Sequence, residues 1–498
     1  MSNSTTFKPI PCGKSLPQNN IHSVSVSLPT LKDVIDYEED TNDIKNKITT
    51  GYPRFVTHIY IKKMATFLRN KYSIDNSYEI IIINSKKYED IIYNKYNIDN
   101  TYILKEAFGI VIVAKNSSKL KDILSFIQHI GCILSSRFAQ DYLYTNNILK
   151  SKQLEDLDES KNGYHNIKNI LAQAYNENID NISLCISGMN AIYSTLEGIK
   201  NINQNKNIII QLGWIYLDTM NILQKYDYNT KIFYDIKNMD STIEYIEKYK
   251  EQISTIITEI PTNPLLLTVD IVKVKELCIK YNIILIIDTT LASAYNLNLN
   301  KYADIYIESL TKYACGNADV MMGAIIVNKN STILKYKEKI FQKSDIPYIK
   351  DIQRLSLQIK DYKNRILKVN QNSIKLLNHL KNKKYIKHIY HTLTNDNKSI
   401  YSKLMRNKEA IGGIISLTFT KPFEKVYNTL NFAKGPSLGT TFTLLMPYVY
   451  LAHYDLIKSK KGTKLLKNNN IDKNILRVSV GVENIEDIIK EFDRLDKI

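Results

Sequence analysis

Five short, continuous apolar runs between residues 207 and 328 constrain the fold of this chain most strongly. They read NIIIQLG, ISTIITEI, IILIIDTT, IYIESL and GAIIVN, and segments with helical periodicity over 188–199, 241–249 and 270–281 lie before and between them. Strands that are apolar throughout, rather than alternating, are typical of a parallel sheet that helices cover on both faces. The pattern therefore predicts an α/β fold with a mainly parallel sheet.

Further strand and helix patterns flank these runs. Upstream, after a helix over 61–72, YEIIIINSKKYEDIIYNKY and FGIVIVAKNSSKLKDILSFIQHIG each predict a strand followed by a helix. Downstream, a helical stretch over 346–381, the runs GGIISLTFT and LRVSVGVE, and a closing helix over 485–495 predict a smaller α/β domain. We expect an N-terminal arm with an extra α/β segment over 1–160, a central domain over 161–345 and a C-terminal domain over 346–498.

The first twenty residues, MSNSTTFKPIPCGKSLPQNN, lack periodicity and the basic-then-apolar pattern of a signal peptide. We expect them to form a disordered tail on a cytoplasmic protein. No apolar run is long enough for a membrane span. The five cysteines are widely spread and never spaced CxxC, and His388 and His391 have no third ligand type nearby, which argues against disulfides and against a metal site.

The chain carries 67 Lys and Arg against 50 Asp and Glu, which is a net charge of +17. Nucleic-acid-binding proteins cluster such a charge in a patch or stripe. Here the lysines are scattered along the whole chain, without a helix-turn-helix, zinc-finger or RNP pattern. We expect a solvated basic surface that attracts anionic metabolites, and no nucleic-acid partner.

Polar residues follow the predicted strands at 259–263, 288–290 and 309–312. In parallel sheets, ligands bind at the carboxyl ends of the strands, so these residues are candidates for a site. The motif SGMNAI adds Gly188 and Met189 at the start of a helix, where free N–H groups and the helix dipole attract a phosphate.

Four of these side chains have complementary chemistry. Ser309 and Thr311 supply hydroxyl donors for an anion, while Asp288, after a buried strand, is a carboxylate that needs a cation. Lys312 in a desolvated pocket would have a lowered pKa and act as a nucleophile. Each feature alone is more often structural. Together they indicate pyridoxal phosphate bound covalently through a lysine.

Several motifs occur in the order known from one enzyme family: SGMNAI, EIPTNP, IIDTT, ESLTKY followed by GNADVMMGA, SLGTTFTL and LRVSVGVE. The chain resembles the Cys/Met-metabolism family of pyridoxal-phosphate enzymes, to which cystathionine γ-synthase belongs. HSVSVSLPT, DYEE and TTGYPRF near the N-terminus, with GPSLGTTFTLLMPYVYLAHY later, resemble the fungal-type cystathionine γ-synthases, which also carry an extra segment before SGM.

The resemblance implies an aspartate-aminotransferase-like (fold-type I) domain and a set of cofactor contacts. Lys312 would hold pyridoxal 5'-phosphate covalently and then carry protons, Asp288 would pair with the pyridinium nitrogen, and Asn263 would bond the 3-oxygen. The ring would stack on Tyr216. The remaining contacts, mostly to the phosphate, are implied for Gly188, Met189, Thr290, Ser309 and Thr311.

Tyr52 and Arg54 match a motif that reaches the phosphate of a neighbouring subunit in the family. This implies a homodimer or homotetramer with active sites shared between subunits. Arg477 matches the arginine that clamps the substrate α-carboxylate with a bidentate fork, and Ser437 would line the same end of the site.

Two motifs depart from the wider family. Where bacterial and plant members have YGGT, this chain has YLDT, so that Leu217 and Asp218 replace two glycines. In SLGTTFTL, Phe442 stands where other γ-synthases have a glutamate that handles the substrate side chain. Both changes concern the choice of reaction more than cofactor binding.

The sequence predicts a γ-replacement enzyme that joins an O-acyl-L-homoserine (O-succinyl or O-acetyl) to L-cysteine, giving L-cystathionine. Sulfide as the acceptor, or a lyase reaction on the same scaffold, remains open because such enzymes differ in pocket shape rather than in catalytic residues. A non-catalytic relative is a further alternative, and the intact Lys312, Asp288 and Arg477 argue against it.

Overall fold

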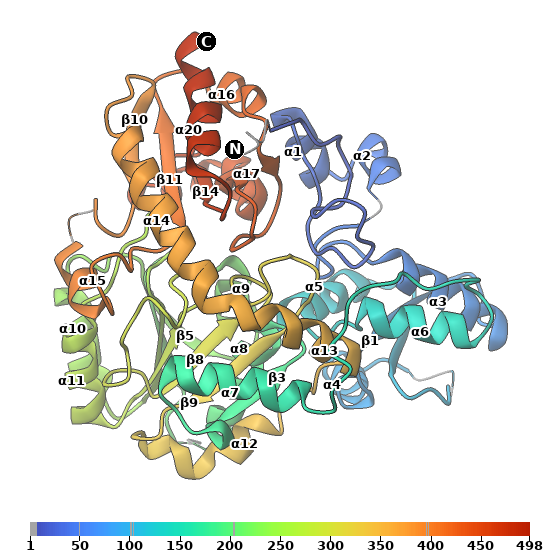
Figure 1. The fold of residues 1–498 in the computed structure, drawn as a ribbon. Helices are drawn as coiled ribbons and strands as arrows, with labels where there is room; N and C mark the ends of the chain where they lie inside the picture. The colour runs from blue at the N-terminus through green and yellow to red at the C-terminus, as the bar shows by residue number, and fades with distance from the viewer. Residues whose placement is uncertain are drawn as a thin grey trace.

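Seven strands form the central sheet in the computed structural model, which describes residues 7–498 except 49, 100, 101, 103, 203, 204, 395 and 397. The strand order is β3-β9-β8-β7-β6-β4-β5, and the sheet lies in the middle of the molecule (Figure 1). The bounds are β3 (Ile182–Cys185), β4 (Ile208–Leu212), β5 (Asn229–Phe233), β6 (Ile253–Glu259), β7 (Ile284–Asp288), β8 (Ile305–Ser309) and β9 (Gly323–Val327).

The prediction of a mainly parallel sheet is confirmed. Strands β5, β4, β6, β7 and β8 pair in parallel, and β9 is antiparallel to both of its neighbours, β8 and β3. Alternate residues of one strand enter two different cores, because both faces are covered: Leu285 and Ile287 enter one, Ile284 and Ile286 the other. This explains why the strands read as continuous apolar runs.

Helices cover both faces of the central sheet. The first core contains side chains of α7 (Gly163–Tyr175), α10 (Asp240–Tyr249), α11 (Ile271–Tyr281), α13 (Ile349–Gln358) and α14 (Tyr362–Leu380). The second contains side chains of α8 (Gly188–Lys200), α9 (Leu217–Lys225) and α12 (Lys337–Phe341). The helical stretch predicted over 346–381 is thus two α-helices, α13 and α14, with a short 3-10 turn between them at Ile359–Asp361.

A second sheet belongs to the C-terminal part of the chain. Its order is β10-β11-β14-β13-β12, and its pairs are antiparallel except for β12 with β13. The strands are β10 (Ile386–Tyr390), β11 (Ile414–Phe419), β12 (Ala433–Lys434), β13 (Leu444–Pro447) and β14 (Leu476–Ser479). The helices are α15 (Lys398–Leu404), α16 (Phe423–Thr429), α17 (Tyr448–Ala452), α18 (Tyr454–Ile457), α19 (Lys460–Asn468) and α20 (Ile485–Phe492).

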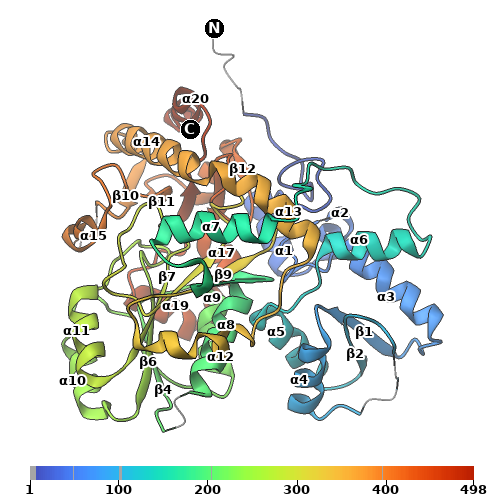
Figure 2. The ribbon, with the colours of Figure 1, turned by 60° about the horizontal axis from the view of Figure 1, so that its bottom comes forward.

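The extra α/β segment forms a separate antiparallel pair, β1 (Tyr78–Ile83) with β2 (Gly109–Ala114). One face of this pair packs in a small core with α3 (Ile59–Lys71) and α6 (Ser136–Thr145). The other face joins the second core of the central sheet through α4 (Lys86–Tyr96) and α5 (Leu120–Ile130). In Figure 2, α5 lies between the β1–β2 pair and α8.

The N-terminal arm differs from the expected disordered tail. Residues 1–6 lie outside the described part, but Leu16, Val26 and Leu28 are buried, and the last two pack with α14, β13 and β14. The serines between them are also buried, and hydrogen bonds satisfy their hydroxyls there. For example, Ser25 Oγ donates to Pro436 O at 2.6 Å. This packed segment has the sequence HSVSVSL, in which small polar and apolar residues alternate. The chain then continues into α1 (Leu31–Glu38) and α2 (Asn42–Lys47).

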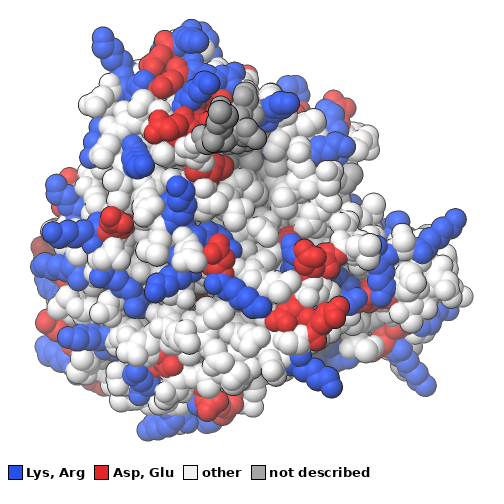
Figure 3. Space-filling view, viewed as in Figure 1, with Lys and Arg blue, Asp and Glu red and all other residues white. Residues whose placement is uncertain are grey.

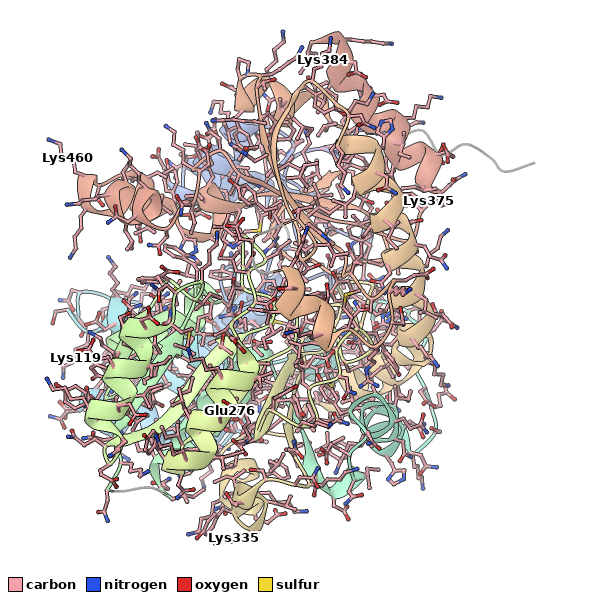
Figure 4. All side chains as sticks on the ribbon, turned by 90° about the vertical axis from the view of Figure 1, so that its left-hand side faces the viewer. Lys119, Glu276, Lys335, Lys375, Lys384 and Lys460 are labelled. Atoms are coloured by element: carbon pink, nitrogen blue, oxygen red, sulfur yellow. The ribbon has the colours of Figure 1, made fainter. Side chains whose placement is uncertain are left out.

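Charged side chains are dispersed over the surface. On the face drawn in Figure 3, Lys and Arg alternate with Asp, Glu and uncharged residues. In the side view of Figure 4, labelled lysines such as Lys335, Lys384 and Lys460 lie at the periphery of the molecule. Within the described part of the chain, no helix combines the length and the apolar character needed to cross a membrane.

Candidate functional site

A cavity lies at the carboxyl ends of β6, β7 and β8, beside the N-terminus of α8. Strands β13 and β14 of the second sheet contribute Met446 and Arg477 to its lining. The structure therefore brings residues from both sheets and from the N-terminal arm together. The predicted site residues that line the cavity are Tyr52, Arg54, Gly188, Met189, Tyr216, Asn263, Asp288, Thr290, Ser309, Lys312, Ser437 and Arg477.

Lys312 lies in the turn that follows β8 and extends its amine into the cavity. Its Nζ donates to Ser437 Oγ at 3.0 Å and lies 3.5 Å from Tyr52 Oη. Burial lowers the pKa of Lys312, and Arg477 adds to the effect, although Tyr52 opposes it. Burial alone would raise the pKa of Tyr52, but the charges of Lys312 and Arg54 outweigh it and lower that pKa. Lys312 is thus poised to act as a neutral nucleophile.

The lowered pKa predicts how covalent attachment of pyridoxal phosphate to Lys312 depends on pH. The neutral amine is the reactive form, and a lowered pKa produces it at lower pH. The attachment rate should rise with pH and reach half its maximum below 10.5, the ordinary lysine value. The measurement is the growth of visible absorbance after mixing cofactor-free protein with pyridoxal phosphate, with free Nα-acetyllysine as the matched control. A midpoint at or above that of the free amine would contradict the prediction.

Two carboxyl groups face each other at the ends of neighbouring strands, because Glu259 of β6 pairs in register with Asp288 of β7. Asp288 Oδ1 accepts from the backbone N–H of Thr290 at 2.8 Å, and Glu259 Oε1 accepts from that of Tyr216 at 2.6 Å. Burial raises the pKa of both, and Asp288 raises the pKa of Glu259 further. Glu259 therefore holds its proton more strongly than Asp288 does.

The N-terminus of α8 closely approaches the end of β8. A Cβ at Gly188 would lie 2.9 Å from Ser309 Cβ, so a glycine is required there. The helix dipole and the Ser309 hydroxyl thus meet at one end of the cavity, which suits an anion. Thr311 is the one predicted cofactor contact that is not among the residues lining the cavity. Its Oγ1 accepts from Met322 N at 3.1 Å and lies 3.3 Å from Met322 O, because the chain turns away from the cavity after β8.

Arg54 is held by several partners at the edge of the cavity. Its Nη1 donates to Gln128 O at 2.9 Å and forms an ion pair with Asp218, and its Nη2 donates to Tyr216 Oη at 2.5 Å. Burial alone would lower the pKa of Arg54. The interactions with Tyr216 and Asp218 are stronger than this effect, so the pKa of Arg54 is raised. Arg54 and Tyr52 line the cavity that contains Lys312.

Arg477 on β14 faces the same space as Lys312. Its Nη2 donates to Ser437 O at 2.8 Å, and its guanidinium lies 5.6 Å from the centre of the Tyr448 ring. Ser437 therefore contacts both cations, with its hydroxyl toward Lys312 and its carbonyl toward Arg477. It does so at φ +100°, which L-residues rarely adopt and which proteins retain where the surroundings fix it.

Some lining residues were not predicted. Tyr448 and Leu451 lie in the motif GPSLGTTFTLLMPYVYLAHY, yet nothing in its spacing indicates which side chains face the cavity. The Tyr448 hydroxyl lies 3.2 Å from Nε2 of buried His453, to which Trp214 Nε1 also donates at 3.0 Å. Phe442 does not line the cavity. It packs with Leu16 of the N-terminal arm, Ala433 and Leu444.

The residues present suit pyridoxal phosphate. Among the described residues, Asp288 has no cationic partner, and Asn263 Oδ1 is buried without a hydrogen-bond partner. A ring nitrogen cation and a ring hydroxyl would satisfy such groups. The α8 N-terminus, Ser309 and Arg54 offer donors to a phosphate, and Lys312 offers an amine to an aldehyde.

Comparison with known proteins agrees with this geometry. A family model described as "Cys/Met metabolism PLP-dependent enzyme" matches residues 111–495. An L-2-amino-4-chloropent-4-enoate dechlorinase/desaturase from Streptantibioticus cattleyicolor is 31% identical, over 95% of this chain and 96% of that protein. A cystathionine γ-synthase from Saccharomyces cerevisiae is 25% identical, over 97% of this chain and 98% of that protein.

The fold is also that of solved structures. A cystathionine γ-synthase from Xanthomonas oryzae pv. oryzae, crystallised with cystathionine, superposes with a TM-score of 0.59 at 18% identity, over 70% of this chain and 90% of that chain. The comparison supports the shared fold. The match to the family model covers the greater part of the chain and includes the strand ends around the cavity.

Proposed function

Since the chain belongs to the Cys/Met metabolism family of PLP-dependent enzymes, we propose that it joins an O-acyl-L-homoserine to L-cysteine and so forms L-cystathionine. The chain is an enzyme, and pyridoxal phosphate is its cofactor. Relatives named cystathionine γ-synthase, from Saccharomyces cerevisiae among others, support this reaction. All five cysteines are free thiols, which supports a reducing compartment, and the cytoplasm is the proposed location.

One observation supports the proposal most directly: Ser437 contacts both Lys312 and Arg477. A substrate α-carboxylate bound by the Arg477 fork would place the adjacent Cα beside the Lys312 amine. When bound, pyridoxal phosphate supplies an electron sink that makes protons near the substrate amine acidic. Lys312 would then remove the Cα proton and return protons later in the reaction.

Tyr52 is better suited than Tyr216 to assist these proton transfers. The Tyr52 hydroxyl lies 3.5 Å from Lys312 Nζ, and the nearby cations lower its pKa. Burial raises the pKa of Tyr216, whose hydroxyl already accepts from Arg54. We therefore assign Tyr216 to stacking on the ring and Tyr52 to proton transfer beside Lys312.

A second candidate, elimination of a γ-leaving group without an incoming amino acid, is favoured by the residues that line the cavity. Cysteine would bring a second carboxylate, and the cationic side chains among the described lining residues are Arg54, Lys312 and Arg477. Arg54 is already paired with Asp218. The remaining wall is largely apolar, with Leu217, Leu438, Met446 and Leu451, and the relative from Streptantibioticus cattleyicolor is named a dechlorinase/desaturase.

One assay series distinguishes these reactions. Purified protein with cofactor receives O-acetyl- or O-succinyl-L-homoserine together with L-cysteine, with sulfide, or with no thiol, and products are measured by mass spectrometry. We expect cystathionine to exceed every other product when cysteine is present. A 2-oxo acid and ammonia, formed equally with and without thiol, would favour elimination. Turnover with sulfide but not with cysteine would replace the proposal with a sulfhydrylase.

A further inference from the structure

We propose that the extra α/β segment, from α3 to α6, positions the N-terminus of α8 for the cofactor phosphate, with Tyr88 of α4 as a positioning residue. No described residue between 59 and 145 lines the cavity, so the segment acts on the site through other residues. The inference concerns cofactor binding, so it does not depend on which γ-reaction the enzyme performs.

The N-terminus of α8 is confined between two parts of the chain. On one side lies the end of β8 with Ser309, and on the other lies the C-terminal end of α5, where a Cβ at Gly131 would lie 2.2 Å from Ser187 Oγ. Ser187 Oγ donates to Gly131 O at 3.0 Å and, as the helix cap, accepts from Asn190 N at 3.0 Å. The cap leaves the first two N–H groups of α8, which have no partner within the helix, available to an anion.

Asn190, in the first turn of α8, connects the helix directly to α4. It is fully buried, and its Nδ2 donates to Tyr88 Oη at 2.6 Å. The Tyr88 hydroxyl in turn donates to Lys343 O at 2.9 Å, and Asn190 Oδ1 accepts from Asp345 N at 3.3 Å. A buried polar group that loses its partner costs free energy, so these bonds hold the first turn of α8 in one position.

Helix α4 also binds the loop between α12 and α13, which supplies these partners. Lys87 Nζ donates to Lys343 O at 3.0 Å and to Ser344 O at 2.8 Å. It also forms an ion pair with Asp345, with Nζ and Oδ1 2.7 Å apart, and Asn84 Nδ2 donates to the same carboxylate at 2.9 Å. The loop, α4 and the first turn of α8 thus form one hydrogen-bonded unit, and α5 packs against α8 beside it (Figure 2).

The role proposed for this unit is specific to the phosphate. Hydrogen bonds from N–H groups to an anion weaken steeply when they are misaligned, so a small shift of the α8 end lowers the affinity for a phosphate. Pyridoxal, which lacks the phosphate, reacts with Lys312 without using α8. A fault in positioning therefore weakens binding of pyridoxal phosphate and spares pyridoxal, whereas a general loss of folding weakens both.

Binding of both compounds to cofactor-free Tyr88→Phe tests the proposal. The variant keeps the ring but removes the hydroxyl between Asn190 and Lys343. We expect the Kd of pyridoxal phosphate, measured by the visible absorbance of the lysine-bound form, to rise about tenfold, while that of pyridoxal changes less than about twofold. Tyr93→Phe is the matched control and should leave both constants unchanged, because Tyr93 also lies on α4 but its hydroxyl accepts from Ile112 N of β2 at 3.1 Å.

A mutant cycle tests whether Tyr88 acts through Asn190. Asn190→Ala alone should raise the Kd of pyridoxal phosphate at least as much as Tyr88→Phe does. Adding Tyr88→Phe to Asn190→Ala should then change the constant less than about twofold, because the two side chains share one hydrogen bond. Equal losses for pyridoxal and pyridoxal phosphate, additive effects in the double variant, or wild-type affinity in Tyr88→Phe would each overturn the proposal.

Lys87→Gln tests the same unit without a change in the core, since the Lys87 side chain is 36% exposed. We expect the Kd of pyridoxal phosphate to rise about threefold, again with little change for pyridoxal. If Tyr88→Phe did not fold, the ratio of the two constants in Lys87→Gln would decide the proposal, and a ratio equal to that of the wild type would overturn it. These readouts use no substrate, so a failure of the proposed reaction is recorded separately.

Discussion

Lys312→Ala should abolish covalent cofactor attachment and reduce kcat by about 10⁴-fold, because one amine both holds the cofactor and moves the protons. That factor corresponds to about 5.4 kcal/mol of transition-state stabilisation. The Nζ atom of Lys312 lies among Ser437, Tyr52 and the charge of Arg477, and the described structure offers no second lysine in the cavity lining. The measurements are the visible absorbance of the protein and steady-state turnover.

Two controls separate loss of chemistry from loss of fold. Lys384→Ala, at an exposed lysine on the periphery in Figure 4, should leave absorbance and turnover unchanged. A small primary amine added to Lys312→Ala should restore part of the proton transfer, provided the protein is folded. Retention of wild-type kcat by Lys312→Ala would remove the basis of the proposed mechanism.

Arg477→Met should lower kcat/KM by about 10²- to 10³-fold, since it removes a buried bidentate partner of the substrate carboxylate. Arg477 is buried and lines the cavity, where it contacts Ser437. The effect should fall mainly on KM, while the absorbance of bound cofactor remains, because Arg477 binds substrate rather than phosphate.

Arg477→Lys is the matched variant, because it keeps the charge but loses the planar fork. We expect it to recover less than about a tenth of the lost kcat/KM. Steady-state kinetics at several substrate concentrations provide the comparison. If Arg477→Met lost cofactor and substrate affinity together, Arg477 would belong to the cofactor site instead.

The central sheet could be predicted from the sequence because its strands are buried on both faces and so appear as unbroken apolar runs. The strands that escaped prediction are short or lie at an edge. The edge strand β5, with the sequence NTKIF, is partly exposed, and β3 has only the four residues ISLC. Local patterns predict such strands poorly, since their stability depends on pairing with distant segments.

Site residues at strand ends could be predicted for a similar reason, because parallel strands bring their carboxyl ends together. Lys312 and Asp288 follow from this rule alone. Arg477 and Arg54 required the resemblance, and the partners of Arg54 could not be predicted because Asp218 lies 164 positions away in the chain. Thr311 lies outside the cavity lining, and a motif does not reveal in which direction a side chain points after a turn.

The position of the cavity between two sheets has a thermodynamic consequence. A molecule bound there contacts residues of both, such as Asp288 of β7 and Arg477 of β14, and gains its full binding energy only when both sheets are folded. At a cofactor concentration 100 times the dissociation constant, this linkage adds about 2.7 kcal/mol to the free energy of unfolding. Partial opening of either sheet loses this binding free energy. The bound cofactor therefore makes the unfolding of the two sheets more cooperative.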